Sequence, residues 1–263
     1  MSHTWASSTP SPTALPPSVV ADWKAISGKI PACLTTLPNL AVLDFTGNTL
    51  SGEIPSEIGE LSRLMMLNLA DNKISGAIPS PICNLKTLMH LDLSNNKLSG
   101  EIPSDVGKLT MISRFLLSGN QLTGSIPDYI SDISRLVDLD FSMNQISGEI
   151  PEKLGSMPIL STLDLSSNQL SGEIPSSLLK NRGLSMLNLS KNCLEGDLPD
   201  AFGPETYFTA LDLSENNLTG RVPNSLWSVK YIGTLGLNHN KFDASSMAKM
   251  GCNWQCWPLC ECE

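Results

Sequence analysis

The stretch LSRLMMLNLADNKISGAIPSPIC, residues 61–83, carries the spacing that decides the fold. Its leucines alternate at Leu67 and Leu69, as a short strand with one buried face requires. Asn72 follows where the chain leaves that strand. Because asparagine carries both an amide donor and a carbonyl acceptor, we expect Asn72 to turn inward and bond backbone groups that the bend leaves unpaired. The stretch therefore predicts one turn of chain that buries one side of a short strand.

The same unit recurs along the chain with a period of 24 residues. The asparagines at this position, called here the ladder asparagines, are Asn48, Asn72, Asn96, Asn120, Asn144, Asn168, Asn192, Asn216 and Asn240. Glycines recur at the same interval from Gly28 to Gly220, each with a proline three residues later. One unit, or coil, buries no core alone, so stability must come from the stacking of neighbouring coils. We predict an α/β solenoid with 24-residue repeats, a parallel concave sheet, short second strands, and 3₁₀ or helical turns on the convex side.

Two further stretches carry a family resemblance, KLSGEIP at 97–103 and QLSGEIP at 169–175. Together with the spacing L-x-x-L-x-L-x-x-N-x-L, they resemble the plant-type subclass of leucine-rich repeats over about residues 19–240. The chain is similar to plant secreted proteins of this class, which include polygalacturonase-inhibiting proteins and DNA-damage-repair/toleration leucine-rich repeat proteins. Residues 21–40 and 202–226 resemble the latter group. The resemblance implies a right-handed superhelix, a location outside the cell or in the cell wall, and a protein partner on the concave face.

Charge and composition argue against several functional classes. A formal net charge of −9 and a pI near 4.8 disfavour nucleic acid as a partner, because such binding needs Lys and Arg to neutralise phosphates. No apolar run approaches the length of about 18 residues that a membrane span needs, and the first residues lack the apolar segment of a secretory signal peptide. Stacked aspartates such as Asp140 and Asp164 lack a pocket that would separate their pKa values. We therefore expect no enzyme, no cofactor and no metal site.

The two ends of the chain depart from the repeat. We expect residues 1–18 to be disordered or atypical, since they show no repeat pattern and lack the Cys-paired cap with which plant relatives begin. The chain thus resembles a larger secreted protein that has lost its signal peptide, cap and early repeats, and its uncovered N-terminal edge invites self-association. We expect residues 241–263 to form a Cys-rich C-terminal cap, with a frayed tail as the alternative. The spacing of its cysteines favours disulfides over zinc: Cys252, Cys256, Cys260 and Cys262.

Three other cysteines lie within the repeats. Cys33 and Cys83 fall two coils apart, which exceeds the reach of a disulfide. We therefore predict that both are small buried hydrophobic residues. The odd total of seven leaves at least one thiol unpaired.

Two N-glycosylation sequons begin at Asn188 and Asn217. They agree with an extracellular protein, although repeats rich in Asn and Ser also generate such triplets by chance. A glycan on Asn188 would project from the concave face and block that end of it.

Function in this architecture falls on the outward positions of the sheet, because the same column of every coil faces the same side. One column carries five aspartates, which would attract a basic protein patch, although L-D-L-S is also the habitual strand of plant-type repeats. A second column places His90, Arg114 and Asp138 among methionines, the ingredients of a protein-binding hot spot; a simple Arg114–Asp138 pair is the alternative. The predicted partner-binding residues are Met66, Met89, His90, Asp92, Arg114, Leu116, Asp138, Asp140 and Asp164.

These observations lead to three functional hypotheses. The first is a non-enzymatic protein-binding module of plant extracellular recognition or defence, able to inhibit a cell-wall hydrolase such as polygalacturonase. The second is a receptor-like ectodomain fragment or signalling scaffold that pairs with another leucine-rich repeat protein. Ice binding is a minor alternative, because one column repeats a hydroxyl: Ser51, Ser75, Ser99, Thr123, Ser147 and Ser171. Glutamates such as Glu53 and Glu101 beside this column argue against an ice plane, since charged rows hydrate strongly.

Overall fold

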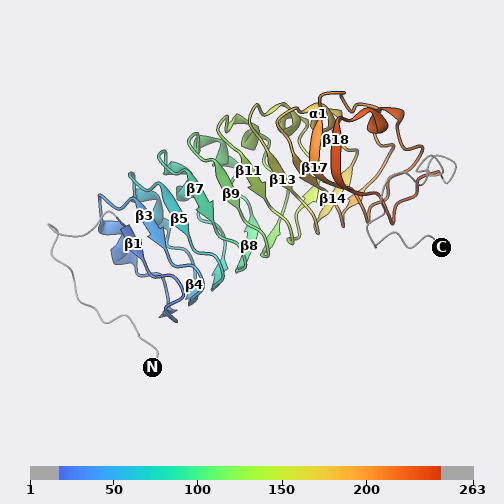
Figure 1. The fold of residues 1–263 in the computed structure, drawn as a ribbon. Helices are drawn as coiled ribbons and strands as arrows, with labels where there is room; N and C mark the ends of the chain where they lie inside the picture. Colours follow the sequence, from blue (N-terminus) through green and yellow to red (C-terminus); the bar gives the residue numbers. More distant parts are fainter. Residues whose placement is uncertain (1–17, 244–263) are drawn as a thin grey trace.

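The computed structural model describes residues 18–243, which form a single stack of coils (Figure 1). The expectations for residues 1–17, for the tail cysteines and for the cap beyond residue 243 lie outside the described residues. Ser18 already belongs to the first strand, β1 (Ser18–Val20). Within residues 18–243, no helix is long and apolar enough to cross a membrane.

One face of the stack is a ten-stranded sheet in which every neighbouring pair is parallel. Equivalent residues 24 positions apart are direct partners, as Met66 is of His90. This arrangement confirms the predicted leucine-rich repeat solenoid. In spatial order the strands are β1, β3 (Val42–Asp44), β5 (Met66–Asn68), β7 (His90–Asp92), β9 (Arg114–Leu116), β11 (Asp138–Asp140), β13 (Thr162–Asp164), β15 (Met186–Asn188), β17 (Tyr207–Asp212) and β18 (Tyr231–Gly236).

Shorter strands follow the ladder positions and build two smaller parallel sheets. They are β2 (Ser27–Gly28), β4 (Thr49–Gly52), β6 (Lys73–Gly76), β8 (Lys97–Glu101) and β10 (Gln121–Thr123) in one sheet, and β12 (Ser147–Gly148), β14 (Gln169–Gly172) and β16 (Cys193–Leu194) in the other. Gly76 has a φ of 81°, in the left-handed region that glycine adopts without strain. The glycine column therefore lets each second strand bend toward its proline.

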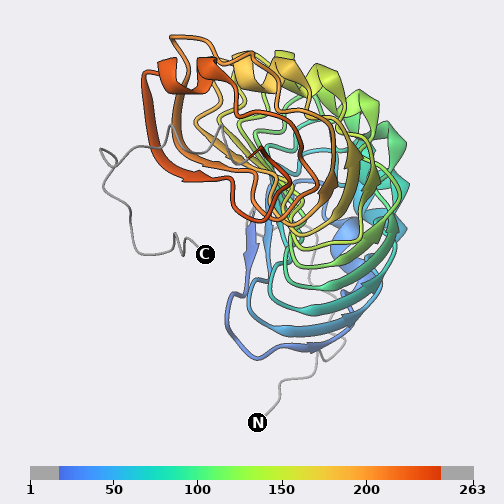
Figure 2. The same cartoon turned by 90° about the vertical axis from the view of Figure 1, so that its right-hand side faces the viewer.

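Short helical turns run along the other side of the stack, one in each coil except the one around residues 200–204, and Figure 2 shows them following one another along the outside of the strands. They are η1 (Ala32–Thr36), η2 (Ser56–Glu60), η3 (Ser80–Asn84), η4 (Ser104–Lys108), η5 (Asp128–Asp132), η6 (Glu152–Ser156), α1 (Ser176–Lys180) and η7 (Asn224–Ser228). Every second turn carries a glycine that faces the next turn: Gly59, Gly107 and Gly155. A Cβ atom on Gly107 would lie 2.6 Å from the carbonyl oxygen of Tyr129, closer than real Cβ atoms come. The convex turns thus approach one another in pairs.

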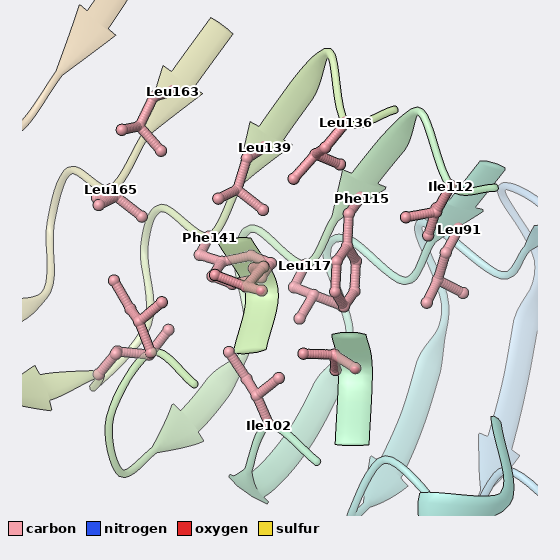
Figure 3. Packing of buried hydrophobic residues seen from close by; sticks show 14 of the residues in the cluster. Leu91, Ile102, Ile112, Phe115, Leu117, Leu136, Leu139, Phe141, Leu163 and Leu165 are labelled. Carbon is pink, nitrogen blue, oxygen red and sulfur yellow. The ribbon is translucent and has the colours of Figure 1, made fainter. Parts of the chain in front are cut away.

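A continuous apolar core fills the coils from one end of the described chain to the other. Leu67 and Leu69, which alternate in the sequence, both point into it and are fully buried. Figure 3 shows Phe115 and Phe141 meeting edge to face in neighbouring coils, with ring centroids 5.1 Å apart. Because each layer packs on the next, the sheet above the core is held as one surface.

The ladder asparagines all point into the stack and bond backbone groups. In each, the side-chain oxygen accepts from a backbone N–H 22 residues earlier, and the amide nitrogen donates to a carbonyl 27 residues earlier. For Asn96 these partners are Ile74 N at 2.9 Å and Leu69 O at 2.9 Å. The series therefore connects successive coils where the strands end.

The cysteine prediction was right for Cys83 and wrong for Cys33. Cys83 is buried, and burial raises the pKa of its thiol to about 11. Cys33 is exposed. The two residues are 50 positions apart, not 48, so they occupy different positions on their turns, and Cys33 takes the outward one. Within residues 18–243, these two and Cys193 are free thiols.

Candidate concave binding face

The outward side chains of the ten-stranded sheet form one open surface, called here the concave face. It consists of the first and third residues of the strands from β3 to β15, with their equivalents in β17 and β18. The middle residue of each three-residue strand is buried and the first and third are largely half-buried. This alternation follows from the pleat of a strand that buries one side.

The predicted partner-binding residues of the strands lie together on this face. Met66, His90, Arg114 and Asp138 are successive partners across β5, β7, β9 and β11. At the third position of the strands, the successive partners from β7 to β13 are Asp92, Leu116, Asp140 and Asp164. The 24-residue register therefore assembles them from five consecutive coils.

Arg114 and Asp138 form an ion pair across neighbouring strands, with Nε of Arg114 3.2 Å from Oδ2 of Asp138. Half of the Arg114 side chain and about a third of the Asp138 side chain remain exposed, at 50% and 31%. Solvent screens a pair of this kind, so it contributes little to stability.

His90 lies beside this pair with an uncommitted ring nitrogen. Its Nε2 atom is buried and has no hydrogen-bond partner in the described chain. Burial lowers the pKa of His90, and the charge of Arg114 lowers it further, while the carboxylates of Asp92, Asp44 and Asp138 oppose the shift. At neutral pH the ring is therefore uncharged, and its buried Nε2 is left without a hydrogen bond.

Exposed methionines surround His90. Met65 and Met89 are 46% and 37% exposed, which is high for large apolar side chains, and Met66 is half-buried. Methionine side chains are flexible and polarisable, so they adapt to different partner surfaces. Met65, which immediately precedes Met66 in the sequence, joins the predicted cluster.

The aspartate column has a structural role that the sequence did not reveal. Oδ1 of Asp140 accepts from the backbone N–H of Ser142 at 3.0 Å, two residues further along the chain. Asp44, Asp92, Asp164 and Asp212 make the same bond, as do Asn68 and Asn188. Such Asx turns explain why Asp or Asn fills most of this column. Leu116 and Gly236 depart from it.

An aromatic pair at the C-terminal end of the sheet was missed from the sequence. The rings of Tyr207 and Tyr231 stack with centroids 4.8 Å apart and planes inclined by 16°, and both side chains are exposed. Their 24-residue separation was the signal that could have found them, because equal positions in successive coils are neighbours.

The two sequons differ in their surroundings. Oδ1 of Asn188 accepts from both the N–H and the hydroxyl of Ser190, and its amide nitrogen donates to Oδ2 of Asp164 at 3.1 Å. Asn217 lies at the start of the short-strand segment of its coil, and its backbone N–H donates to Leu194 O. Its side-chain amide makes no hydrogen bond to the part of the chain that the structure describes.

Across residues 18–243, no group of three or more His, Cys, Asp and Glu residues is arranged to hold a metal ion. An open hollow of about 380 Å³ lies on the convex side between η2 and η3, lined by Ser56, Glu57, Gly59, Glu60, Pro81 and Asn84.

Comparison with known proteins places this geometry in a family. Residues 62–122 match the leucine rich repeat family in one description. Further segments match it in a second: 39–61, 112–133, 135–157, 160–181, 183–204 and 207–229.

Three individual proteins illustrate the likeness. The structure is similar to the plant peptide hormone receptor RGFR1 in complex with RGF2, with a TM-score of 0.81 and 37% identity, covering 82% of this chain and 35% of that one. It is similar to a plant ice-binding protein, with a TM-score of 0.76 and 34% identity, covering 83% of this chain and 70% of that one. Over 38 residues the sequence is 55% identical to the DNA damage-repair/toleration protein DRT100 of Arabidopsis thaliana, covering 14% of this chain and 10% of that protein. The chain thus spans about a third of the receptor's length and a tenth of DRT100's.

Proposed function

This chain belongs to the leucine-rich repeat family, and from that premise we propose that it is a non-enzymatic protein-binding module of the plant extracellular type, with its ligand on the concave face. The observation that carries the proposal is the cluster around His90. There, exposed methionines adjoin a buried ring nitrogen without a partner and an arginine held by Asp138. Adaptable apolar area beside a half-exposed arginine is what a protein partner needs from a hot spot.

The test places a photo-crosslinking amino acid on two faces of the same molecule. One variant carries it at Met89, next to His90 at the edge of the concave face, and the matched control carries it at the exposed Gln145, two residues before β12. Both are exposed to proteins washed from plant cell walls. We expect a cross-linked partner at position 89 and none at position 145.

Competition shows whether the capture is specific. Excess unlabelled wild-type protein should abolish the cross-link, whereas excess Arg114→Glu protein should not, because that variant repels Asp138 and alters the hot spot. A partner captured equally at both positions, or displaced equally by both competitors, would refute the concave site.

The finer identity of the partner is also a proposal. Inhibition of a cell-wall hydrolase such as polygalacturonase is supported by the likeness of the sequence to the inhibitor class. It is tested by adding the protein to a purified fungal polygalacturonase and measuring the release of reducing sugar. Unchanged activity with the protein in excess excludes this target.

The alternative, a receptor-like ectodomain or signalling scaffold, is supported by the likeness to a receptor that was solved with RGF2 bound. Pairing with another leucine-rich repeat protein, or with a second copy at the N-terminal edge, would appear as association that depends on concentration in analytical ultracentrifugation. A monomer at all concentrations, alone and with such proteins, excludes the scaffold. We further propose that the chain is secreted, that Asn188 and Asn217 are its glycan acceptors, and that its tail is a disulfide-linked cap.

Ice binding stays a minor alternative, supported by the hydroxyl column and by the likeness to a plant ice-binding protein. The register counts against it, because Ser51 pairs with Lys73 and Ser75 with Lys97. Lysine residues thus alternate with the hydroxyl residues in the register of this sheet. Thermal hysteresis of a concentrated solution tests it, and a value equal to that of albumin excludes it.

A further inference from the structure

Carboxylates recur on every second strand of the concave face. Asp44, Asp92 and Asp140 are the third residues of β3, β7 and β11, while Asn68 and Leu116 take that place in the strands between them. The three aspartates therefore form a row whose period is two coils.

One oxygen of each of these carboxylates remains uncommitted. Oδ1 accepts a backbone N–H at 3.0 Å in Asp44, Asp92 and Asp140. Oδ2 of each has no hydrogen bond from the described chain. Asp164 differs, because its Oδ2 accepts from the amide of Asn188. The row of free oxygens thus ends at Asp140.

The concave face holds no spare cation to neutralise this row. Among the outward positions of the ten-stranded sheet in residues 18–243, Arg114 is the one Lys or Arg residue, and it is paired with Asp138. A partner that supplies cations therefore complements the face, whereas an acidic partner meets an unbalanced row of carboxylates.

The spacing of the row selects the conformation of that partner. Neighbouring strands lie about 4.8 Å apart, so alternate strands lie about 9.6 Å apart. A polyproline II helix has three residues per turn and rises about 3.1 Å per residue, so every third side chain faces the same way at intervals of about 9.3 Å. In an extended strand, side chains on the same face recur at about 6.7 Å, and in an α-helix one turn rises about 5.4 Å. Neither interval matches the spacing of about 9.6 Å between the aspartates.

We propose that the concave face binds a basic protein segment in the polyproline II conformation, lying across β3 to β11. Lysine or arginine at every third residue of the segment contacts Asp44, Asp92 and Asp140 in turn. Leu116, which replaces an Asx residue in this column, lies between two of these contacts and packs against the apolar part of the segment. The proposal rests on the proposed function, since it assigns a partner chemistry to the same face.

The chain itself supplies the substitution that tests the charges. Asn68 and Asn188 stand in the same column and accept the same backbone bond through Oδ1, from Ala70 and Ser190, at 3.1 Å each. Replacing aspartate by asparagine therefore removes the charge and keeps the turn. The test protein carries D44N, D92N and D140N. The matched control carries E53Q, E101Q and E149Q, which remove three exposed charges at the same two-coil interval from the short-strand side.

Two labelled peptides of identical composition test the spacing. In KPPKPPKPP the lysines recur every third residue, and in KPKPKPPPP they recur every second residue. Binding is measured by fluorescence anisotropy at low and at physiological salt. We expect the first peptide to bind at least tenfold more tightly than the second at low salt.

The protein variants then locate the contact. Three exposed ion pairs, each contributing about two- to threefold, predict a loss of about tenfold in the triple Asp→Asn protein and no change in the triple Glu→Gln protein. Equal binding of the two peptides, equal losses in the two proteins, or no binding of either peptide would each overturn the inference. The cross-link at Met89 tests the proposed function independently. A negative result with the peptides would therefore overturn the polyproline II inference and leave the proposed function to be decided by the cross-link.

Discussion

The amide nitrogen of Asn120 donates a hydrogen bond of 3.0 Å to the carbonyl oxygen of Leu93 in the preceding coil. The same side chain also donates to Leu117 O and accepts from Leu98 N, each at 3.0 Å. One buried asparagine therefore satisfies backbone groups of two coils, in a place where water does not reach.

The Asn120→Ala substitution should destabilise the solenoid by roughly 3 kcal/mol, because it leaves several buried backbone groups without partners. Asn240→Ala is the matched control. It removes the same bonds at the last ladder position, which is half-buried, and should cost about 1 kcal/mol. Urea unfolding followed by circular dichroism measures both, and equal losses would contradict the role of burial.

Gly107→Ala should destabilise the protein by about 1–3 kcal/mol, because the new methyl group would press on the backbone of the next convex turn. Gly203→Ala serves as control, since its Cβ would meet only Thr206 Cγ2, at an ordinary 3.7 Å. Thermal melting compares the two. A Gly107→Ala protein as stable as the wild type would mean that the paired turns can separate freely.

His90 should make the stability of the protein depend on pH. Burial and Arg114 lower its pKa in the folded protein, so the unfolded chain takes up the proton at higher pH than the folded chain does. Stability is then lost as the pH falls through the ordinary histidine pKa of about 6.5.

The wild type should therefore lose more stability than His90→Gln between pH 7 and pH 5. Urea midpoints across this range measure the difference, and the carboxylates common to both proteins cancel. A direct titration of His90 by NMR gives an independent check. A pKa above 6.5 would reverse the expected sign.

The Arg114–Asp138 pair should contribute only about 0.5 kcal/mol to folding, since solvent screens both side chains. A double-mutant cycle with Arg114→Ala and Asp138→Ala measures this coupling in the free protein. Repeating the cycle on the affinity for a captured partner should give a larger coupling if the pair positions Arg114 for binding. Equal couplings would show that the pair plays no part in recognition.

Much of the architecture could be predicted because its rules are local and repeated. Alternation at Leu67 and Leu69 specifies a buried strand, and the amide of Asn72 has the groups needed to close the bend. Since every coil follows the same residue pattern, a wrong prediction in one coil does not move the predicted strands and turns of the next. The columns of the concave face followed from the register alone.

The details of the site could not be predicted, because they depend on distances between neighbouring coils. The sequence indicated an acidic column but could not show that one oxygen of each aspartate is already bonded to the backbone. It indicated His90 as a candidate but not that its Nε2 is buried without a partner. The 24-residue separation of Tyr207 and Tyr231 could have predicted that they are neighbours, but not that their rings stack in nearly parallel planes.

The sequence by itself determined the period, the parallel sheet and the set of side chains that share a face, since a 24-residue repeat places equal positions side by side. Only the tertiary structure decided which of those side chains are already satisfied, which turns approach in pairs, and where uncommitted groups remain. The physical reason is that hydrogen bonding and burial are properties of pairs of coils in contact, whereas the repeat is a property of each coil alone.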